Sequence, residues 1–333
     1  LGDDYLKLNA NESSQEPSPR VLEVLKNVQN LNYYNDPCQH KLRQKLADLH
    51  SLDKTNIIVG TGADDVLDLI FRTFFERGDK LAFPKVTYPF YKGYADTYGY
   101  EALEVPLTKD LRVDLSDYED LPHAVLVVNP DAPTGFLKPL SAIKKLVASH
   151  PERLVIVDEA YIDFGGESAL SLINKYDNLI VTRTFSKSRS MAGMRIGYCI
   201  GNEQLISVLN SVKFSFNSYT MSDVAIKCGV ASINDDTYFK NIVAKIIDTR
   251  EKTKESLTKL GFSFLDSSSN FIFAKHNEIS GEELFNALKK NKIFVRHFNA
   301  PRINEYLRIT IGTEREMKEL ISFLDSYISG KRG

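Results

Sequence analysis

Short apolar runs alternate with amphipathic stretches through the first two thirds of the chain. Six of the runs predict β-strands, at residues 57–60, 81–83, 124–129, 154–158, 179–183 and 196–200. Because strands that alternate with helical segments usually join in parallel, this order predicts an α/β fold with a mostly parallel sheet sandwiched by helices. Several runs are apolar almost throughout, as expected for strands that are covered on both faces.

The pattern changes after residue 235, where a long stretch of helical periodicity begins and the order of elements becomes α+β. A chain of 333 residues exceeds what one packed core normally takes. We therefore predict two domains. Residues 30–235 form the large α/β domain, and an N-terminal arm at 1–29 joins residues 236–333 in a smaller α+β domain.

Composition narrows the class of protein. Apolar residues make up 43% of the chain, and 42 basic residues stand against 44 acidic ones, for a net charge of −2. This balance predicts a folded globular protein and gives no reason to expect a nucleic-acid or membrane partner.

No apolar run approaches the roughly 18 residues that cross a bilayer, so we expect a cytoplasmic protein. Cys38, Cys199 and Cys228 have irregular spacings that fit neither a disulfide framework nor a metal site.

The segment from Thr184 to Arg195 is the most informative for chemistry. Lys187 follows a predicted strand, stands next to the hydroxyl of Ser186, and precedes Arg195 by eight residues. An amine can bond the aldehyde of a cofactor, while hydroxyls and a guanidinium can hold its phosphate. Taken alone, the segment fits a solvated lysine and arginine in a loop better.

A second segment follows the apolar strand that ends at Asp158. A carboxylate there could keep a pyridine nitrogen protonated, because an ion pair in a low-dielectric site favours both charged forms. Tyr161 could donate to a phenolic oxygen, and the small Ala160 would let a flat ring lie against the backbone. An aspartate that caps the following turn is an equally good interpretation of this segment alone.

Gly62, Ala63 and Asp64 open an amphipathic helix whose first amides and dipole could bind a phosphate. The lysine of a P-loop is missing, and capping by aspartate remains an alternative. Tyr88 could stack on a ring. Arg308 lies in a β-like run and needs an anionic partner, which is either a structural carboxylate or a substrate anion.

Taken in order, these segments resemble the fold-type I pyridoxal-phosphate aminotransferases, and more narrowly the branch that acts on histidinol phosphate. The resemblance runs from Lys7–Glu12, with the sequence KLNANE, to Leu307–Gly312, with the sequence LRITIG. It implies that Lys187 bonds the aldehyde of pyridoxal 5'-phosphate, Asp158 pairs with the pyridine nitrogen, and Tyr161 bonds the phenolic oxygen. Further contacts to the cofactor are implied for Tyr88 and Ala160 at the ring, and for Gly62, Ala63, Asp64, Thr184, Ser186 and Arg195 at the phosphate.

The resemblance also implies a homodimer, in which Tyr34 reaches the cofactor phosphate of the neighbouring subunit. Arg308, Arg296 and Asn11 would bind the substrate. One position departs from the family: relatives usually place asparagine before Pro-Thr-Gly to bond the phenolic oxygen, whereas this chain has Ala132 there. The loss of one neutral hydrogen bond, worth about 0.5 to 1.5 kcal/mol, leaves the covalent chemistry intact.

The expected activity is transamination of histidinol phosphate with 2-oxoglutarate, giving imidazole acetol phosphate and glutamate, a step of histidine biosynthesis. An aromatic amino acid aminotransferase is an alternative, because the same arginine can bind an α-carboxylate. A pyridoxal-phosphate threonine-phosphate decarboxylase and a non-catalytic cofactor-binding module are less favoured. A dehydrogenase is disfavoured because no G-x-G-x-x-G motif opens the first unit.

Overall fold

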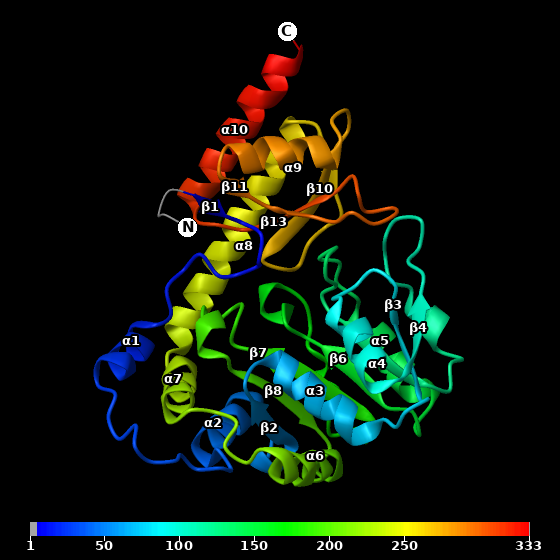
Figure 1. The fold of residues 1–333 in the computed structure, drawn as a ribbon, viewed down its shortest axis with the longest axis vertical. Helices are drawn as coiled ribbons and strands as arrows, with labels where there is room; N and C mark the ends of the chain where they lie inside the picture. The colour runs from blue at the N-terminus through cyan, green and yellow to red at the C-terminus, as the bar shows by residue number, and fades with distance from the viewer. Residues whose placement is uncertain (1–4, 333) are drawn as a thin grey trace.

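A seven-stranded sheet lies at the centre of the larger part of the computed structural model, which describes residues 5–332. Figure 1 shows this sheet below a smaller part that carries the C-terminus. The strand order across the sheet is β2 (Ile57–Gly60), β8 (Gly197–Gly201), β7 (Leu179–Thr184), β6 (Val155–Asp158), β5 (Ala124–Val128), β3 (Lys80–Pro84) and β4 (Glu101–Val105).

The neighbouring strands from β7 to β4 pair in parallel, and β8 is antiparallel to both of its neighbours. Only residues 185–196 join β7 to β8, without a crossover helix, so the chain returns in the opposite direction. The predicted mostly parallel sheet is confirmed. The sequence reasoning missed β4 at the sheet edge, because the exposed Glu101 and Glu104 interrupt its apolar run.

Helices cover both faces of the sheet, as the apolar strands require. Successive residues of β6 alternate between the faces: Val155 and Val157 contribute to one core, and Ile156 contributes to the other. On the Val155 side pack α2 (His40–His50), α5 (Leu140–Ser149) and α7 (Asp223–Ile233). On the Ile156 side pack α3 (Ala63–Phe74), α4 (Phe90–Tyr98) and α6 (Glu203–Phe216).

The smaller part is built on a four-stranded antiparallel sheet. Its strand order is β12 (Arg296–His297), β13 (Leu307–Thr310), β10 (Phe271–His276) and β9 (Phe262–Phe264). Its helices are α8 (Asp236–Lys259), α9 (Gly281–Lys290) and α10 (Glu314–Arg332). A separate apolar core, which includes Ile246, Leu284 and Leu320, holds these elements together.

The N-terminal arm contacts both parts. Strand β1 (Leu6–Lys7) pairs in parallel with β11 (Ile293–Phe294) of the smaller part. Helix α1 (Pro19–Lys26) packs instead against α7, and its Val21 is buried in a core of the larger part. The division of the chain at residues 29/30 and 235/236 stays a prediction. Among residues 5–332, no helix combines the length and apolar character needed to span a bilayer.

Candidate active site

A cavity of about 410 Å³ opens at the carboxyl ends of β5 and β6, beside the N-terminus of α3. Ligands in open α/β folds bind at this edge of the sheet. Ten of the residues predicted from the sequence line the cavity: Ala63, Asp64, Tyr88, Asp158, Ala160, Tyr161, Thr184, Ser186, Lys187 and Arg195. The fold therefore brings the separate sequence segments into one site.

Lys187 lies in the loop after β7, where its side chain is half-buried. Its Nζ atom donates a hydrogen bond to the carbonyl oxygen of Ala10 at 3.4 Å and lies 5.7 Å from the centre of the Tyr161 ring. Both contacts are weak. Lys187 therefore lines the cavity with an amine that has only weak contacts among the described residues.

Asp158 is the last residue of β6 and only 5% exposed. Its Oδ2 atom accepts a hydrogen bond from the Tyr91 hydroxyl at 2.6 Å, and Oδ1 accepts one from the Ala160 amide at 3.0 Å. Burial raises the pKa of this carboxyl group, and the two hydrogen bonds only partly offset that effect. The site thus contains a buried carboxylate whose hydrogen-bond donors are uncharged.

Tyr91 is a residue of this cavity that sequence reasoning missed. It is completely buried near the start of α4, with its ring edge-on to Tyr88. Burial, followed by the nearby charge of Asp158, raises the pKa of its hydroxyl group, so Tyr91 acts as a hydrogen-bond donor. Tyr88 lies just before α4 and Tyr91 lies in its first turn, but no sequence pattern links Tyr91 to Asp158.

Tyr161 and Asn11 form a pair across 150 residues of sequence. The Asn11 side-chain amide donates to the Tyr161 hydroxyl at 3.0 Å. Asn11 has a positive φ of 55° and is held by Thr310, whose hydroxyl accepts from the Asn11 backbone amide at 3.0 Å. The N-terminal arm thus fixes the orientation of the Tyr161 hydroxyl at the cavity wall.

A cluster of donors suited to a phosphate lies at the other end of the cavity. The hydroxyls of Thr184 and Ser186 are 3.0 Å apart, and the Arg195 guanidinium donates to Ser186 Oγ at 3.5 Å. Arg195 also lies 3.5 Å from Asp64 Oδ2 in the first turn of α3. The first amides of a helix have no acceptor within the helix, so this end combines backbone donors with a guanidinium.

Gly62 suits this arrangement in both backbone conformation and space. It caps α3 at a φ of +93°, and a Cβ atom there would lie 2.3 Å from Arg195 Nη2. Gly62 does not itself line the cavity, but it allows the arginine to approach the helix. Tyr88 belongs to the same end, because its hydroxyl donates to Asp64 Oδ1 at 3.2 Å.

Arg308 and Arg296 lie opposite each other on β13 and β12. The Arg308 Nη2 atom donates to the carbonyl oxygen of Asn9 at 3.2 Å, while its buried Nε atom has no hydrogen-bond partner. Within residues 5–332, no carboxylate forms an ion pair with either arginine. Burial and the nearby charge of Arg296 lower the pKa of Arg308. Two neighbouring guanidinium groups that have no carboxylate partner in the described part of the chain can bind an anion.

Of the predicted positions, the cavity wall includes Ala132 and does not include Gly62, Asn11, Tyr34, Arg296 or Arg308. Tyr34 is 83% exposed and packs on Tyr219 with ring centres 4.6 Å apart, so it does not contact the site of its own chain. Ala132 lines the cavity and offers no side-chain amide. The preceding Asp131 instead forms a buried ion pair with Lys138 at 2.5 Å.

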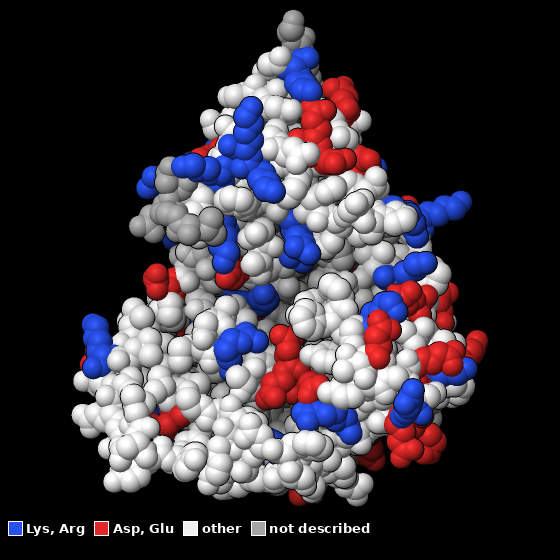
Figure 2. Space-filling model, viewed as in Figure 1, with Lys and Arg blue, Asp and Glu red and all other residues white. Residues whose placement is uncertain are grey.

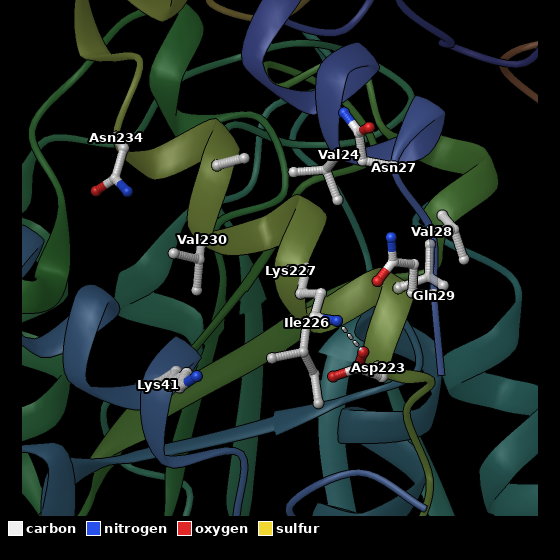
Figure 3. A pocket seen from close by; sticks show the side chains of 12 residues that line it. Val24, Asn27, Val28, Gln29, Lys41, Asp223, Ile226, Lys227, Val230 and Asn234 are labelled. Atoms are coloured by element: carbon white, nitrogen blue, oxygen red, sulfur yellow. Dashed lines mark ion pairs between the residues drawn. The ribbon is translucent and has the colours of Figure 1, made fainter. Parts of the chain in front are cut away.

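A second hollow, of about 480 Å³, lies between α1, α2 and α7. Figure 3 shows apolar side chains such as Val24, Ile226 and Val230 in its wall, beside the ion pair of Asp223 and Lys227. None of the residues predicted to carry chemistry lies in this wall. The chemical site is therefore the cavity at the sheet edge.

A model of the family described as aminotransferase class I and II matches residues 3–324. The chain belongs to this aminotransferase family. A histidinol-phosphate aminotransferase of Brachyspira hyodysenteriae is 46% identical over 317 residues, which cover 94% of this chain and 90% of the relative. The enzyme of the same name from Lactococcus lactis subsp. cremoris is 43% identical over 330 residues, covering 98% of this chain and 93% of the relative.

Solved structures agree with this aminotransferase assignment. The histidinol-phosphate aminotransferase of Sinorhizobium meliloti, solved in complex with pyridoxal-5'-phosphate, superposes with a TM-score of 0.89 at 27% identity. The match covers 98% of this chain and 91% of that structure. The predicted family, fold class, enzyme class and cofactor are thereby confirmed. The roles of individual site residues stay predictions.

Proposed function

We propose that this aminotransferase uses pyridoxal 5'-phosphate to interconvert histidinol phosphate and 2-oxoglutarate with imidazole acetol phosphate and glutamate. The observation that carries the proposal is one cavity that holds a reactive amine, Lys187, and a buried carboxylate, Asp158. The two unpaired arginines on β12 and β13 supply a site for a substrate anion. Relatives at 43–46% identity carry the name of this activity.

The charges of the cavity residues are complementary to the charges of the cofactor. Asp158 is buried, and its two observed donors, Tyr91 and the Ala160 amide, are neutral. A protonated pyridine nitrogen would supply the counter-charge that this carboxylate lacks. At the opposite end, a phosphate would meet Arg195, the two hydroxyls at residues 184 and 186, and the first amides of α3. The order of these groups matches a ring with a cation at one end and a phosphate at the other.

When bound, pyridoxal phosphate supplies an aldehyde for covalent attachment and a ring that delocalises negative charge at the reacting carbon. Asp158 would keep that ring cationic and so increase its capacity to accept electrons. Tyr161, oriented by Asn11, would donate a hydrogen bond to the phenolic oxygen. Lys187 would hold the aldehyde end of the cofactor, and its Nζ atom would move the proton at the reacting carbon of the substrate.

Arg308 and Arg296 bind the anionic end of each substrate. The planar guanidinium of Arg308 can make paired hydrogen bonds with a phosphate or with a carboxylate, so one site serves both half-reactions. The orphaned Nε atom of Arg308 is a donor that such an anion would satisfy. Asn11 contacts both Tyr161 and Thr310 of β13, and it is the third residue that we propose for substrate binding.

The active protein is a homodimer in which Tyr34 completes the phosphate site of the partner. Several large apolar side chains are exposed, with Leu31, Tyr34 and Phe216 at 75%, 83% and 70%. In Figure 2 the face over α2 and α6 carries few charged side chains, whereas basic and acidic groups mix elsewhere. A face with few charged side chains favours association, and so do large exposed apolar side chains. The cytoplasmic location stays a prediction from the sequence.

A substrate panel tests the proposed activity. Histidinol phosphate, phenylalanine, tyrosine and threonine phosphate are each incubated with 2-oxoglutarate, and glutamate formation is measured. We expect the highest kcat/KM with histidinol phosphate. A preference for phenylalanine of about tenfold or more would assign the enzyme to aromatic amino acids. Release of carbon dioxide from threonine phosphate, without consumption of 2-oxoglutarate, would assign a decarboxylase.

A further inference from the structure

Three polar side chains without a role in the mechanism above lie within two residues of a proposed catalytic residue. They are Glu159, Asp163 and Ser188, and their catalytic neighbours are Asp158, Tyr161 and Lys187 respectively. Glu159 and Ser188 are buried, and Asp163 lies in the short helical turn that follows Tyr161. The structure joins Glu159 and Asp163 to the guanidinium of Arg183 on β7, and it joins Ser188 to Asp163.

The contacts form a continuous network behind the cavity. The Arg183 side chain is 11% exposed, with Nη2 donating to Asp163 Oδ1 at 2.8 Å and Nε 3.5 Å from Glu159 Oε2. The Ser188 hydroxyl donates to the other oxygen of Asp163 at 2.5 Å. Glu159 is held further, because its carboxylate accepts from the Ser168 hydroxyl and the Ala169 amide, each at 2.6 Å.

The charges make this network rigid. Burial disfavours the charged form of Asp163, yet Arg183 and the Ser188 hydroxyl outweigh burial and hold its pKa below the ordinary value. A buried guanidinium that loses one of its carboxylates is strongly destabilised. The two carboxylates therefore keep fixed positions relative to Arg183, and so do the backbone segments that carry them.

We propose that Arg183 and Asp163 are positioning residues that set the spacing of Lys187, Asp158 and Tyr161. Glu159 anchors the strand end that carries Asp158, and Ser188 anchors the loop that carries Lys187. The proposal rests on the proposed transamination chemistry, because proton transfer by a lysine amine requires accurate placement of that amine. A misplacement of about 1 Å can lower a rate by about a hundredfold.

Ser188→Ala tests the link to the lysine, because it removes one hydroxyl and leaves the charges in place. The matched control is Ser190→Ala in the same loop, whose hydroxyl contacts Ser13 at 2.8 Å and not the network. For Ser188→Ala we expect kcat to fall about tenfold or more while KM for the amino donor stays within about twofold. Ser190→Ala should match the parent in both constants.

Two readouts besides activity separate positioning from a merely structural role. The pH midpoint of the visible absorbance of the bound cofactor should shift by about half a unit or more in Ser188→Ala, because the amine changes its surroundings. Reduction with borohydride should still attach the cofactor to Lys187. A parent-like kcat and a parent-like absorbance midpoint would overturn the proposal, even if the midpoint of thermal unfolding falls.

Asp163→Asn provides a second variant that keeps an acceptor for Ser188 and removes the charge that pairs with Arg183. It should lower kcat and shift the absorbance midpoint in the same way. If this variant fails to fold, Ser188→Ala alone decides. If the parent proves to use another amino donor, the proposed substrate is wrong, while the same measurements with that donor still test the network.

Discussion

At the residue scale, Asp158 combines a proposed role in catalysis with a cost in stability. Its carboxylate is buried beside Tyr91, and burial raises its pKa above the ordinary value of 3.8. A carboxyl group whose pKa is raised in the folded state contributes its full stabilisation only below its ordinary pKa, where it is protonated. That contribution is lost as the pH rises through the raised pKa. Without its cofactor, the protein is therefore destabilised by Asp158 at neutral pH.

Replacing Asp158 by asparagine should raise the midpoint of thermal unfolding of the cofactor-free protein at pH 7 by about 2 to 4 °C. The difference should shrink toward pH 4, where the parent carboxyl group becomes protonated. Differential scanning calorimetry across this pH range measures the effect. Asp163→Asn is the opposing control: the pKa of Asp163 is lowered, so removal of its charge should destabilise the protein. An unchanged or lower midpoint for Asp158→Asn at pH 7 would contradict this interpretation.

The same asparagine variant should transaminate at least about a hundredfold more slowly than the parent when loaded with cofactor. A neutral amide cannot pair with a pyridinium cation, so the ring loses capacity to accept electrons. The measurement is the steady-state kcat of each protein, compared with the fraction of that protein to which the cofactor is attached. Tyr91→Phe, which removes only the hydroxyl that donates to Asp158, should lower kcat less. Equal activity of Asp158→Asn and the parent would refute the role of Asp158.

Gly62→Ala should weaken cofactor binding by about tenfold or more. The added Cβ atom would lie 2.3 Å from Arg195 Nη2, at a φ of +93° that alanine rarely adopts. Titration of the cofactor-free protein with pyridoxal phosphate, followed by absorbance, gives the dissociation constant. Gly93→Ala is the control, because no atom lies within 4 Å of its added Cβ and its φ is ordinary. Similar affinities for the two variants would refute the role of Gly62.

At the scale of elements, strand ends explain why much of the site could be predicted. Asp158 and Thr184 end neighbouring parallel strands, so their sequence segments must meet at one edge of the sheet. The sequence pattern did not predict the contacts between segments that are far apart in the chain. Asn11 meets Tyr161 through the N-terminal arm, and Ser188 meets Asp163 where the loop after β7 packs on the turn after β6. These contacts depend on how whole elements pack, which the local pattern does not encode.

The pairing of β12 with β13 leads to a prediction for substrate binding, because it sets Arg296 directly opposite Arg308. Arg308→Gln should raise KM for both histidinol phosphate and 2-oxoglutarate by about tenfold or more, since it removes a charged donor from the shared anion site. Arg302→Gln is the control, because Arg302 donates to the carbonyl oxygen of Leu107 at 3.0 Å, away from the cavity. Unchanged KM values in Arg308→Gln would place the anion elsewhere.

At the scale of the whole molecule, the proposed dimer should allow two inactive proteins to restore each other. Lys187→Ala lacks the reactive amine but keeps Tyr34, and Tyr34→Ala keeps the amine. Mixed dimers would contain one site with both groups. When the two variants are mixed, unfolded and refolded together, we expect up to about a quarter of the parent activity, as random pairing gives. Analytical ultracentrifugation checks that dimers form, and no regain of activity would contradict a shared site.

The central claim is that the Lys187 amine, and no other, bonds the cofactor. Purified protein is incubated with pyridoxal 5'-phosphate, reduced with borohydride, digested and mapped by mass spectrometry. The account predicts a single pyridoxyl modification at Lys187, which is absent when reduction is omitted. A modification at another lysine, or an unmodified Lys187 after reduction, would contradict it.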